Sequence, residues 1–301
     1  METALTNTYT PPVDKLLTYG ETQRLSPDEW PNYVEELGLV PEHVPDLIRM
    51  ASDAQLNDAE PEDVRGWAPM HAYRAICQMH VETEIDALLS LIEIFLDSND
   101  FALEEMRYVF SVIGPSTLPK IAEYMANSSH DEWARVCASE AVEEIGLNWP
   151  ESRSGCVRIL MVQLESFEEN GYHFNAFLIH ALAKLQAVEA APLIEQAFAA
   201  NCVEEFVQGD WDDVQVDLGL KSEEELKAQR AREGEEWARE REIERYGAPL
   251  LPGYKRTSLS SEYERTSPLI SHKSSHKSEG AAHKKAKNKM SKQSRKKNRK
   301  R

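Results

Sequence analysis

The chain has 301 residues, of which 41% are hydrophobic, and a formal net charge of −18. This length suits one elongated domain with tails or two small domains, and the apolar content is sufficient for a core. The charge is divided unevenly: residues 273–301 contain 13 Lys or Arg and one acid, which leaves 21 bases and 51 acids in residues 1–272. An acidic body of charge −30 and a basic tail of charge +12 are therefore the main features of the composition.

Secretion, membrane insertion and thiol chemistry are not indicated. The chain starts with neither a basic segment nor an apolar run, as a secretory signal would. The longest apolar stretch, 85–96, is interrupted by charged residues and is too short to span a bilayer. We therefore expect a cytoplasmic protein without a membrane span, whose cysteines are small buried hydrophobic residues and not disulfides or zinc ligands. The four cysteines lie far apart, at Cys77, Cys137, Cys156 and Cys202.

Residues 1–40 are predicted to be an N-terminal extension that contains one short helix. Apolar side chains within 13–17 indicate a short turn that docks on the body. Ser26 as N-cap and Pro27 at the first helical position begin a helix, and Gly38 ends it.

A repeated motif organises the body, which we assign to residues 41–205. It starts with a short helix at 41–51 and an acidic loop at 53–63, and then an aromatic helix start followed by small residues recurs with a period near 33. Such a period is typical of stacked helix pairs. The landmarks of the repeat are Trp67, Ala72, Ala75, Phe101, Trp133, Ala138 and Ala141.

Four helix pairs are predicted from this pattern. Alanine lets neighbouring helices approach to about 8–10 Å, and each pair buries its apolar face only against its neighbours. Trp67 and Trp133 are therefore expected to be buried between repeats. The first helices are predicted at 67–79, 102–113, 131–145 and 174–185, and the second helices at 84–96, 118–125, 155–167 and 190–198.

The pattern changes after Ala200. Residues 206–221 are not predicted to form a helix. They combine aromatic residues with acids, so we predict a cap over the open end of the array, with the residues Asp210, Trp211, Asp212 and Asp213. The carboxylates suit a polar cap or a cation site, and the polar cap is favoured because the loop lacks the glycine and distal glutamate of a calcium-binding hand.

Two further segments complete the chain. Residues 222–247 begin with a Ser222 capping box and are almost wholly charged, which predicts a solvated helix. Residues 248–301 are rich in Ser, Thr, Pro, Lys and His, which predicts a disordered basic tail.

The aromatic-Ala helix starts, together with the string LQAVEAAPLI at 185–194, resemble HEAT-like repeats of the bilin-lyase type, and the resemblance covers roughly residues 67–200. The whole layout is similar to a bacterial and cyanobacterial group of HEAT-like proteins with a comparable GDWDD segment. The resemblance implies an all-α fold, a right-handed α-α superhelix, that acts as a binding scaffold. Some relatives end in a cysteine-rich zinc motif, but no cysteine lies in this C-terminal segment, so zinc binding is not carried over.

Catalytic patterns are not found in the sequence. His71 and His180 each lie alone on a predicted helix, which favours packed or surface histidines over metal ligands. There is no phosphate-binding glycine loop and no G-x-S-x-G motif. Cys137 has the apolar neighbours Ala134, Ala138 and Ala141, which disfavour a reactive thiolate. The sequence thus indicates no enzyme, no catalytic or metal residues, and no cofactor.

The tail suggests contact with a polyanion. Residues 281–301 contain 11 Lys or Arg, no acid and no aromatic residue, so we expect attraction to phosphate without reading of bases. RNA, the ribosome, DNA and anionic lipid all fit, as does a nuclear-import signal; a solvated tail or one that folds back on the acidic body is the alternative. The basic residues are Lys284, Lys285, Lys287, Lys289, Lys292, Arg295, Lys296, Lys297, Arg299, Lys300 and Arg301.

Two functions remain open from the sequence. The first is a non-enzymatic scaffold whose helical array binds a protein partner while the tail contacts RNA, the ribosome or another polyanion. The alternative, implied by the resemblance, is a lyase or chaperone that handles bilins or other tetrapyrroles. In that case Arg74, Arg107 and Arg135 are candidates to contact the propionates.

Overall fold

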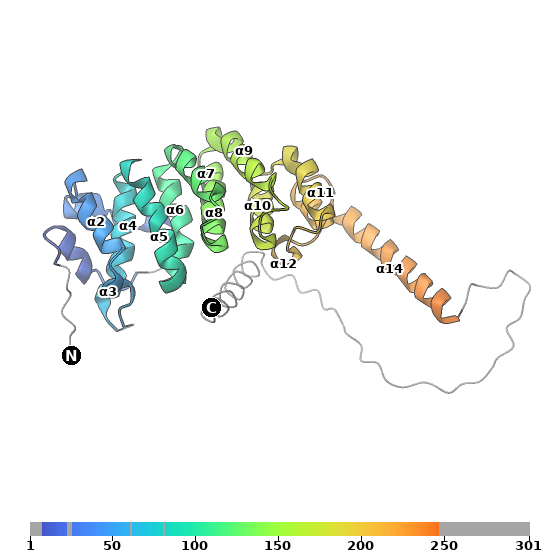
Figure 1. Cartoon of the computed structure of the whole chain (residues 1–301), viewed down its shortest axis with the longest axis horizontal. Helices are drawn as coiled ribbons and strands as arrows, with labels where there is room; N and C mark the ends of the chain where they lie inside the picture. The colour runs from blue at the N-terminus through green and yellow to red at the C-terminus, as the bar shows by residue number, and fades with distance from the viewer. Residues whose placement is uncertain (1–7, 23–25, 61, 81, 247–301) are drawn as a thin grey trace, which may run out of the picture.

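The computed structural model describes residues 8–22, 26–60, 62–80 and 82–246, and within these ranges the chain is helical, with no strands. Figure 1 shows the helices side by side in a long row, from which the last helix projects at one end. In the same ranges, no helix is long and apolar enough to cross a membrane. The predicted all-helical class is therefore confirmed.

The N-terminal extension docks as predicted, but its helix is interrupted. The 3-10 turn η1 (Val13–Thr18) buries Val13 and Leu16 completely. The predicted helix from Pro27 onward is wrong as one element, because it divides into the 3-10 turn η2 (Pro27–Glu29) and α1 (Tyr33–Leu37). Trp30 between them is extended, with ψ of 144°, because the ring of Pro31 disfavours a helical conformation in the preceding residue.

The short helix predicted at 41–51 is present, as η3 (Pro41–His43) followed by α2 (Val44–Ala51). The loop expected at 53–63 also contains α3 (Ala54–Asn57), because the Asp53 carboxylate accepts a hydrogen bond from the Gln55 amide and caps its first turn. The 3-10 turn η4 (Val64–Trp67) then leads into the first of the predicted pairs.

The four predicted helix pairs are all present, with bounds within a few residues of those expected. Prolines mark the start of three of the second helices, because proline fits the first turn of a helix. Two of these helices follow a 3-10 turn that begins with a proline, and the third has a proline in its own first turn. The first helices are α4 (Ala68–Gln78), α6 (Asp100–Ile113), α8 (Glu132–Asn148) and α10 (Tyr172–Lys184). The second helices are α5 (Ile85–Ser98), α7 (Leu118–Ala126), α9 (Arg153–Leu164) and α11 (Ala191–Ala199). The turns before them are η5 (Glu82–Glu84), η6 (Pro115–Thr117), η7 (Pro150–Ser152) and η8 (Val188–Ala190).

The pairs form two layers of helices. In the first layer α2, α4, α6, α8 and α10 contact one another in succession, and in the second layer α5 contacts α7, α7 contacts α9, and α9 contacts α11. First helices also pack on second helices, as α6 does on α5 and α8 on α7 and α9. One continuous apolar core therefore runs between the layers.

The alanine landmarks lie in the core between the helices. Ala72, Ala75, Ala138 and Ala141 are fully buried. Trp133 is also buried, as predicted, and its ring meets Phe177 of the next pair edge to face at 5.8 Å.

Trp67 is less buried than expected. Trp67 is only half-buried, because it lies in η4 before α4 begins, and it meets the half-buried ring of Phe101 edge to face at 6.3 Å. Both landmark tryptophans therefore contact an aromatic ring of the following pair.

The predicted cap is helical, which differs from the expectation of an irregular segment. It contains α12 (Glu205–Gln208) and α13 (Trp211–Asp217), and these helices pack on α10 and α11. Helical spacing is in fact present in the cap, at Val207, Trp211, Val214 and Leu218. Gly209, with φ of 90°, separates the two helices. The long charged helix α14 (Glu223–Tyr246) follows, as predicted from its capping box.

Candidate functional site

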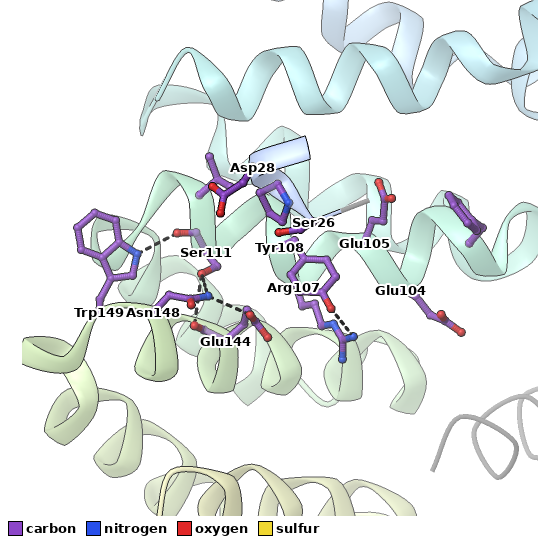
Figure 2. A pocket seen from close by; sticks show the side chains of 13 residues that line it. Ser26, Asp28, Glu104, Glu105, Arg107, Tyr108, Ser111, Glu144, Asn148 and Trp149 are labelled. Carbon is purple, nitrogen blue, oxygen red and sulfur yellow. Dashed lines mark hydrogen bonds between the residues drawn. The ribbon is translucent and has the colours of Figure 1, made fainter. Parts of the chain in front are cut away.

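A pocket of about 600 Å³, here called the acidic pocket, lies between α6, α8 and the turn η2 (Figure 2). Helix α6 supplies Phe101, Glu104, Glu105, Arg107, Tyr108, Ser111 and Val112. The end of α8 supplies Glu144, Asn148 and Trp149, and the turn supplies Ser26, Pro27 and Asp28.

The periodicity of α6 divides its residues between the core and the pocket. Asn99 caps the helix by accepting hydrogen bonds from the amides of Phe101 and Ala102, both at 3.1 Å. From there Phe101, Glu104 and Tyr108 follow at spacings of three and four, so they share one face. The opposite face is apolar and buried in the core.

The indole of Trp149 forms one end of the pocket. Its Nε1 donates a hydrogen bond of 2.9 Å to the carbonyl of Ser111. Gly114, with φ of 98°, makes room for the ring, since a Cβ there would lie 2.9 Å from it. Asn148 Nδ2 donates to Ser111 Oγ at 3.0 Å and to Glu144 Oε1 at 2.9 Å, so this end of the pocket is held by several bonds (Figure 2).

Arg107 is the one basic side chain among the described residues that line the pocket. Its guanidinium lies 4.6 Å from the centre of the Tyr108 ring and donates to the Tyr108 hydroxyl at 2.8 Å. Its buried Nε has no hydrogen-bond acceptor in the described part of the chain. Burial acts to lower the pKa of Arg107, but Glu140, Tyr108 and Glu144 together outweigh it and raise this pKa above its usual value. Negative charge on α8 therefore holds this cation in place.

Acidic residues crowd the neighbouring face of α8. Glu140 is buried, and Glu143 and Glu144 follow it at helical spacing. Burial, together with the charges of Glu140 and Glu144, raises the pKa of Glu143 to about 7, although Arg107 and Lys184 oppose the shift. Glu143 therefore changes its charge near neutral pH.

Glu105 points to the other side of α6 and is neutralised there. Its carboxylate accepts hydrogen bonds from Arg74 Nη2 at 2.5 Å, from Arg74 Nε at 2.9 Å and from the Tyr73 hydroxyl at 2.8 Å. Arg74 also donates to Thr22 Oγ1 at 2.6 Å and is completely buried. Asp28, Glu104 and Glu144 are the other acids that line the pocket.

The arginines suggested for tetrapyrrole propionates are mostly placed elsewhere. Arg74 lies in the buried pair described above. Arg135 is also buried: it donates to the Met125 carbonyl at 2.7 Å and to Asn170 Oδ1 at 3.1 Å, and it lies 4.2 Å from the centre of the Phe174 ring. Arg107 lines the acidic pocket, whereas Arg74 and Arg135 are bonded to the protein itself, so the three do not form one anion-binding surface.

Both histidines singled out from the sequence are packed. His71 Nε2 lies 3.0 Å from the Gly20 carbonyl, which can only accept, so Nδ1 accepts a bond of 2.7 Å from the Tyr33 hydroxyl. Burial lowers the pKa of His71 to about 4, which keeps the ring neutral. His180 Nδ1 lies 2.5 Å from Gln208 Oε1, and burial lowers its pKa as well. In the described part of the chain, no three His, Cys, Asp or Glu side chains gather as a metal ion would require.

The prediction that the cysteines are buried is confirmed for three of the four. Cys77, Cys137 and Cys156 are buried free thiols, and Cys202 is half-buried. Burial raises the pKa of Cys156 to about 11 and that of Cys77 further, so neither is present as a thiolate near neutral pH.

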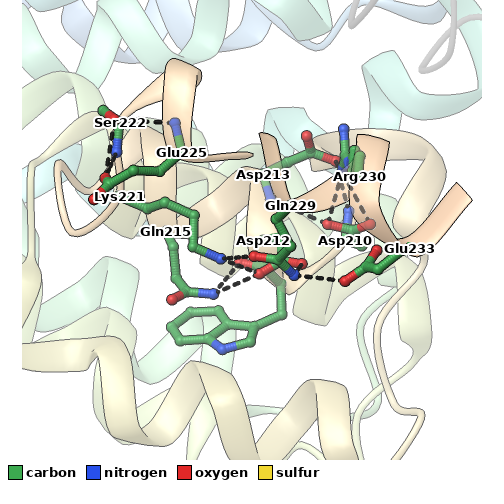
Figure 3. Close-up of polar contacts among 11 residues, drawn as sticks. Asp210, Asp212, Asp213, Gln215, Lys221, Ser222, Glu225, Gln229, Arg230 and Glu233 are labelled. Carbon is green, nitrogen blue, oxygen red and sulfur yellow. Dashed lines mark hydrogen bonds and ion pairs between the residues drawn. The ribbon is translucent and has the colours of Figure 1, made fainter. Parts of the chain in front are cut away.

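The acidic residues of the cap connect it to α14 (Figure 3). Asp212 lies 2.5 Å from Lys221 Nζ, and Arg230 lies 3.0 Å from Asp210 and 2.9 Å from Asp213. The hydrogen bond from Lys221 is the main reason that the pKa of Asp212 is lowered.

The carboxylate of Asp210 also bonds to the backbone of the cap. Asp210 caps α13 by accepting a hydrogen bond of 3.1 Å from the Asp213 amide, and the half-buried Trp211 packs on Phe198. Because all three aspartates have basic partners, the arrangement fits the polar cap and not the cation site that the sequence left open.

Sequence reasoning did not find the acidic pocket. The available signal was the run of Glu140, Glu143 and Glu144 on one face of α8, opposite Glu104 and Arg107 of the preceding pair. The basic residues predicted to bind a polyanion, from Lys284 to Arg301, lie outside the described residues. Compared with known protein families, with curated proteins and with solved structures, the chain shows no match.

Proposed function

We propose that this chain is a non-enzymatic scaffold of HEAT-like repeats that binds a basic segment of a protein partner in the acidic pocket. The observation that carries the proposal is that the carboxylates of Asp28 and Glu144 line one pocket together with the aromatic ring of Trp149. The partner's lysine and arginine side chains would pair with these carboxylates.

The regular arrangement of the helix pairs supports the repeat part of this proposal. First helices contact first helices and second helices contact second helices along the row, and α12 and α13 continue both layers. The contacts from Trp67 to Phe101 and from Trp133 to Phe177 join successive pairs in the same edge-to-face manner. A right-handed α-α superhelix of HEAT-like repeats accounts for these features.

The walls of the pocket suit a basic peptide in two ways. Asp28, Glu104 and Glu144 attract lysine or arginine, and the rings of Tyr108 and Trp149 offer faces on which a cation can rest. The body as a whole carries −30, which increases the rate of encounter with basic partners at low salt.

The basic tail adds a second proposed contact, with RNA, the ribosome or another polyanion, which rests on sequence alone. The tetrapyrrole alternative has less support, because Arg74 and Arg135 are buried in bonds to the protein itself. The cytoplasm is the proposed location, because it supplies reducing conditions for free thiols such as Cys77.

Binding of a fluorescein-labelled oligolysine peptide to the full-length chain, followed by fluorescence anisotropy, tests the pocket. The double variant Glu104→Gln/Glu144→Gln removes two of its carboxylates and should weaken binding about tenfold, if each contact contributes about 0.7 kcal/mol. Arg107→Gln removes the opposing cation and should strengthen binding, a change of opposite sign.

The matched control is Glu168→Gln/Glu169→Gln, which changes the net charge equally at exposed positions in the loop between α9 and α10. It should alter binding by less than about twofold, since distant exposed charges are screened. Equal weakening by both double variants would show that the peptide senses only net charge and would end the proposal. Thermal melts of each variant confirm that the fold is retained.

A further inference from the structure

We infer that the acidic pocket selects arginine over lysine in its basic partner, at the end of the pocket formed by Glu144, Asn148 and Trp149. The inference rests on the proposed function, because it names the side chain that the same site recognises. The hydrogen bonds at this end leave acceptor atoms unused beside an aromatic ring. Such a wall suits a flat cation that carries several donors.

The side-chain donors at this end of the pocket are used within the protein (Figure 2). Asn148 Nδ2 donates to Glu144 Oε1 at 2.9 Å and to Ser111 Oγ at 3.0 Å, which uses both of its hydrogens. The Ser111 hydroxyl donates to the Glu144 carbonyl at 3.3 Å, and Trp149 Nε1 donates to the Ser111 carbonyl at 2.9 Å. Among these four described residues, no side-chain donor is therefore left for a ligand.

Two acceptor atoms remain at the same end. The Glu144 carboxylate can only accept, so its bond to Asn148 fixes the amide with Nδ2 toward Glu144 and leaves Oδ1 as an acceptor. Within the described ranges, neither Asn148 Oδ1 nor Glu144 Oε2 receives a hydrogen bond. Because one bond joins the two side chains, these acceptors are held in place relative to each other. A ligand that binds here must therefore bring the donors.

The ring of Trp149 is fixed beside these acceptors. Its Nε1 bond holds the indole, and Gly114 makes room for it, because a Cβ there would lie 2.9 Å from the ring. A side chain that is already held loses little conformational entropy when a ligand binds. Indole is also the aromatic group that attracts cations most strongly. The ring therefore offers a prepared surface for a cation.

Arginine matches this wall better than lysine does. A guanidinium is planar and has five N–H donors and no acceptor, so it can lie on the indole while its edge donates to Asn148 Oδ1 and Glu144 Oε2. An ammonium group is compact and strongly hydrated, and it meets Glu144 chiefly as a point charge. The shape and the donor pattern of the partner's side chain thus decide the preference, and not its charge.

The other end of the pocket already holds a cation of the chain itself. The Arg107 guanidinium lies 4.6 Å from the centre of the Tyr108 ring and donates to its hydroxyl. Figure 2 shows both residues away from Trp149, farther along α6. Arg107 repels a second cation from the Tyr108 ring, which directs the partner's arginine to Trp149.

Two fluorescein-labelled peptides of equal length and charge, with four arginines or four lysines spaced by Gly-Ser, measure the preference by fluorescence anisotropy with the full-length chain. The unaltered chain should bind the arginine peptide about tenfold more tightly. Trp149→Leu removes the ring and should lower this ratio to about two, because carboxylates alone prefer guanidinium slightly. Trp237→Leu, at an exposed tryptophan of α14, is the matched control and should leave the ratio unchanged.

Asn148→Ala tests the acceptors without removing the ring. Asn148 is exposed, so the fold should be retained, and thermal melts check this for every variant. The change removes Oδ1 and the bond that orients Glu144, so the ratio should fall about threefold. An arginine preference that survives either Trp149→Leu or Asn148→Ala in a folded chain would overturn the inference.

Glu144→Gln separates this inference from the proposed function. It should weaken both peptides, because either cation uses the carboxylate. If both peptides weaken but the unaltered chain binds them within about twofold of each other, the inference fails while the proposed function stands. If neither peptide responds to Glu144→Gln, both fail.

The indole N–H signal of Trp149 gives an independent measurement in solution. The chain has six tryptophans, and the signal of Trp149 is assigned by its absence from the nitrogen-15 spectrum of Trp149→Phe. Nα-acetylarginine amide should shift this signal in the unaltered chain, and Nα-acetyllysine amide at the same concentration should shift it much less. Equal shifts with the two compounds, or shifts confined to other indole signals, would contradict the inference.

Discussion

The two sides of α6 carry the same kinds of charged side chain in opposite circumstances. On the side that faces α4, Glu105 and Arg74 are buried and bonded to each other, and Tyr73 and Thr22 satisfy their remaining groups. On the side that faces the acidic pocket, Glu104 and Arg107 are half-buried, and α8 adds further carboxylates.

The difference separates a structural role for charge from a binding role. A buried pair must be complete, because a lone charge in the core costs several kcal/mol. An open pocket tolerates an excess of one sign, because water and mobile ions screen it until a ligand arrives. The identity of a residue therefore does not reveal its role, whereas its partners and its burial do.

The largest effect is expected where the buried pair is broken. Arg74→Ala leaves Glu105 without its cation inside the core and should cost about 3–5 kcal/mol in free energy of unfolding. Urea unfolding followed by circular dichroism measures this loss. The double variant Arg74→Met/Glu105→Leu should recover part of it, because neither charge is then left alone.

Arg158→Ala is the matched control, since Arg158 is exposed on α9. It should change the free energy of unfolding by no more than about 0.5 kcal/mol. Equal effects of Arg74→Ala and Arg158→Ala would remove the distinction between the two sides of α6.

A smaller effect, dependent on pH, is expected beside the pocket. The pKa of Glu143 is raised to about 7, so the folded chain retains a proton that the unfolded chain loses near pH 4.5. Stability from this group is complete below about pH 4.5 and is lost as the pH rises to 7, with a total on the order of 3 kcal/mol.

Glu143→Gln has no proton to lose, so its advantage over the unaltered chain should grow with pH. Thermal melts should show a small difference at pH 4.5 and a melting point higher by roughly 6–12 °C at pH 8. Glu168→Gln serves as the exposed control and should show no such trend. A constant difference between Glu143→Gln and the unaltered chain would contradict the raised pKa.

The smallest effect is expected in the ion pairs between the cap and α14. Arg230 is about half exposed and pairs with Asp210 and Asp213. Arg230→Ala should cost no more than about 1 kcal/mol, because exposed pairs contribute little. The difference should shrink further near 1 M salt, and a loss as large as that of Arg74→Ala would show that exposure is a poor guide to the role of charge here.

The helix pairs were predictable from sequence because their signals are local. Apolar periodicity and prolines at helix starts indicated α4 to α11, and the capping box of Ser222 indicated α14. Two local signals were overlooked: Pro31, which separates η2 from α1, and the stripe of Val207, Trp211, Val214 and Leu218 in the cap.

The acidic pocket was not predictable in the same way, because it depends on contacts between distant segments. Nothing near Asp28 in sequence indicates that its turn lies beside α6. Glu104 and Glu105 are adjacent, yet only one of them meets Arg74. Which of the two faces the core depends on the rotation of α6 about its axis, which the packing of its whole apolar face determines.

The attachment of α14 has a mechanical consequence. The cap holds this helix by residues close to its start, as far as Arg230, and the 16 residues from there to Tyr246 extend for about 24 Å. A tilt of about 10° at the attachment would move the far end by about 4 Å over that length. A slight adjustment of a few side chains at the attachment therefore displaces the far end of the helix by more than the length of a hydrogen bond.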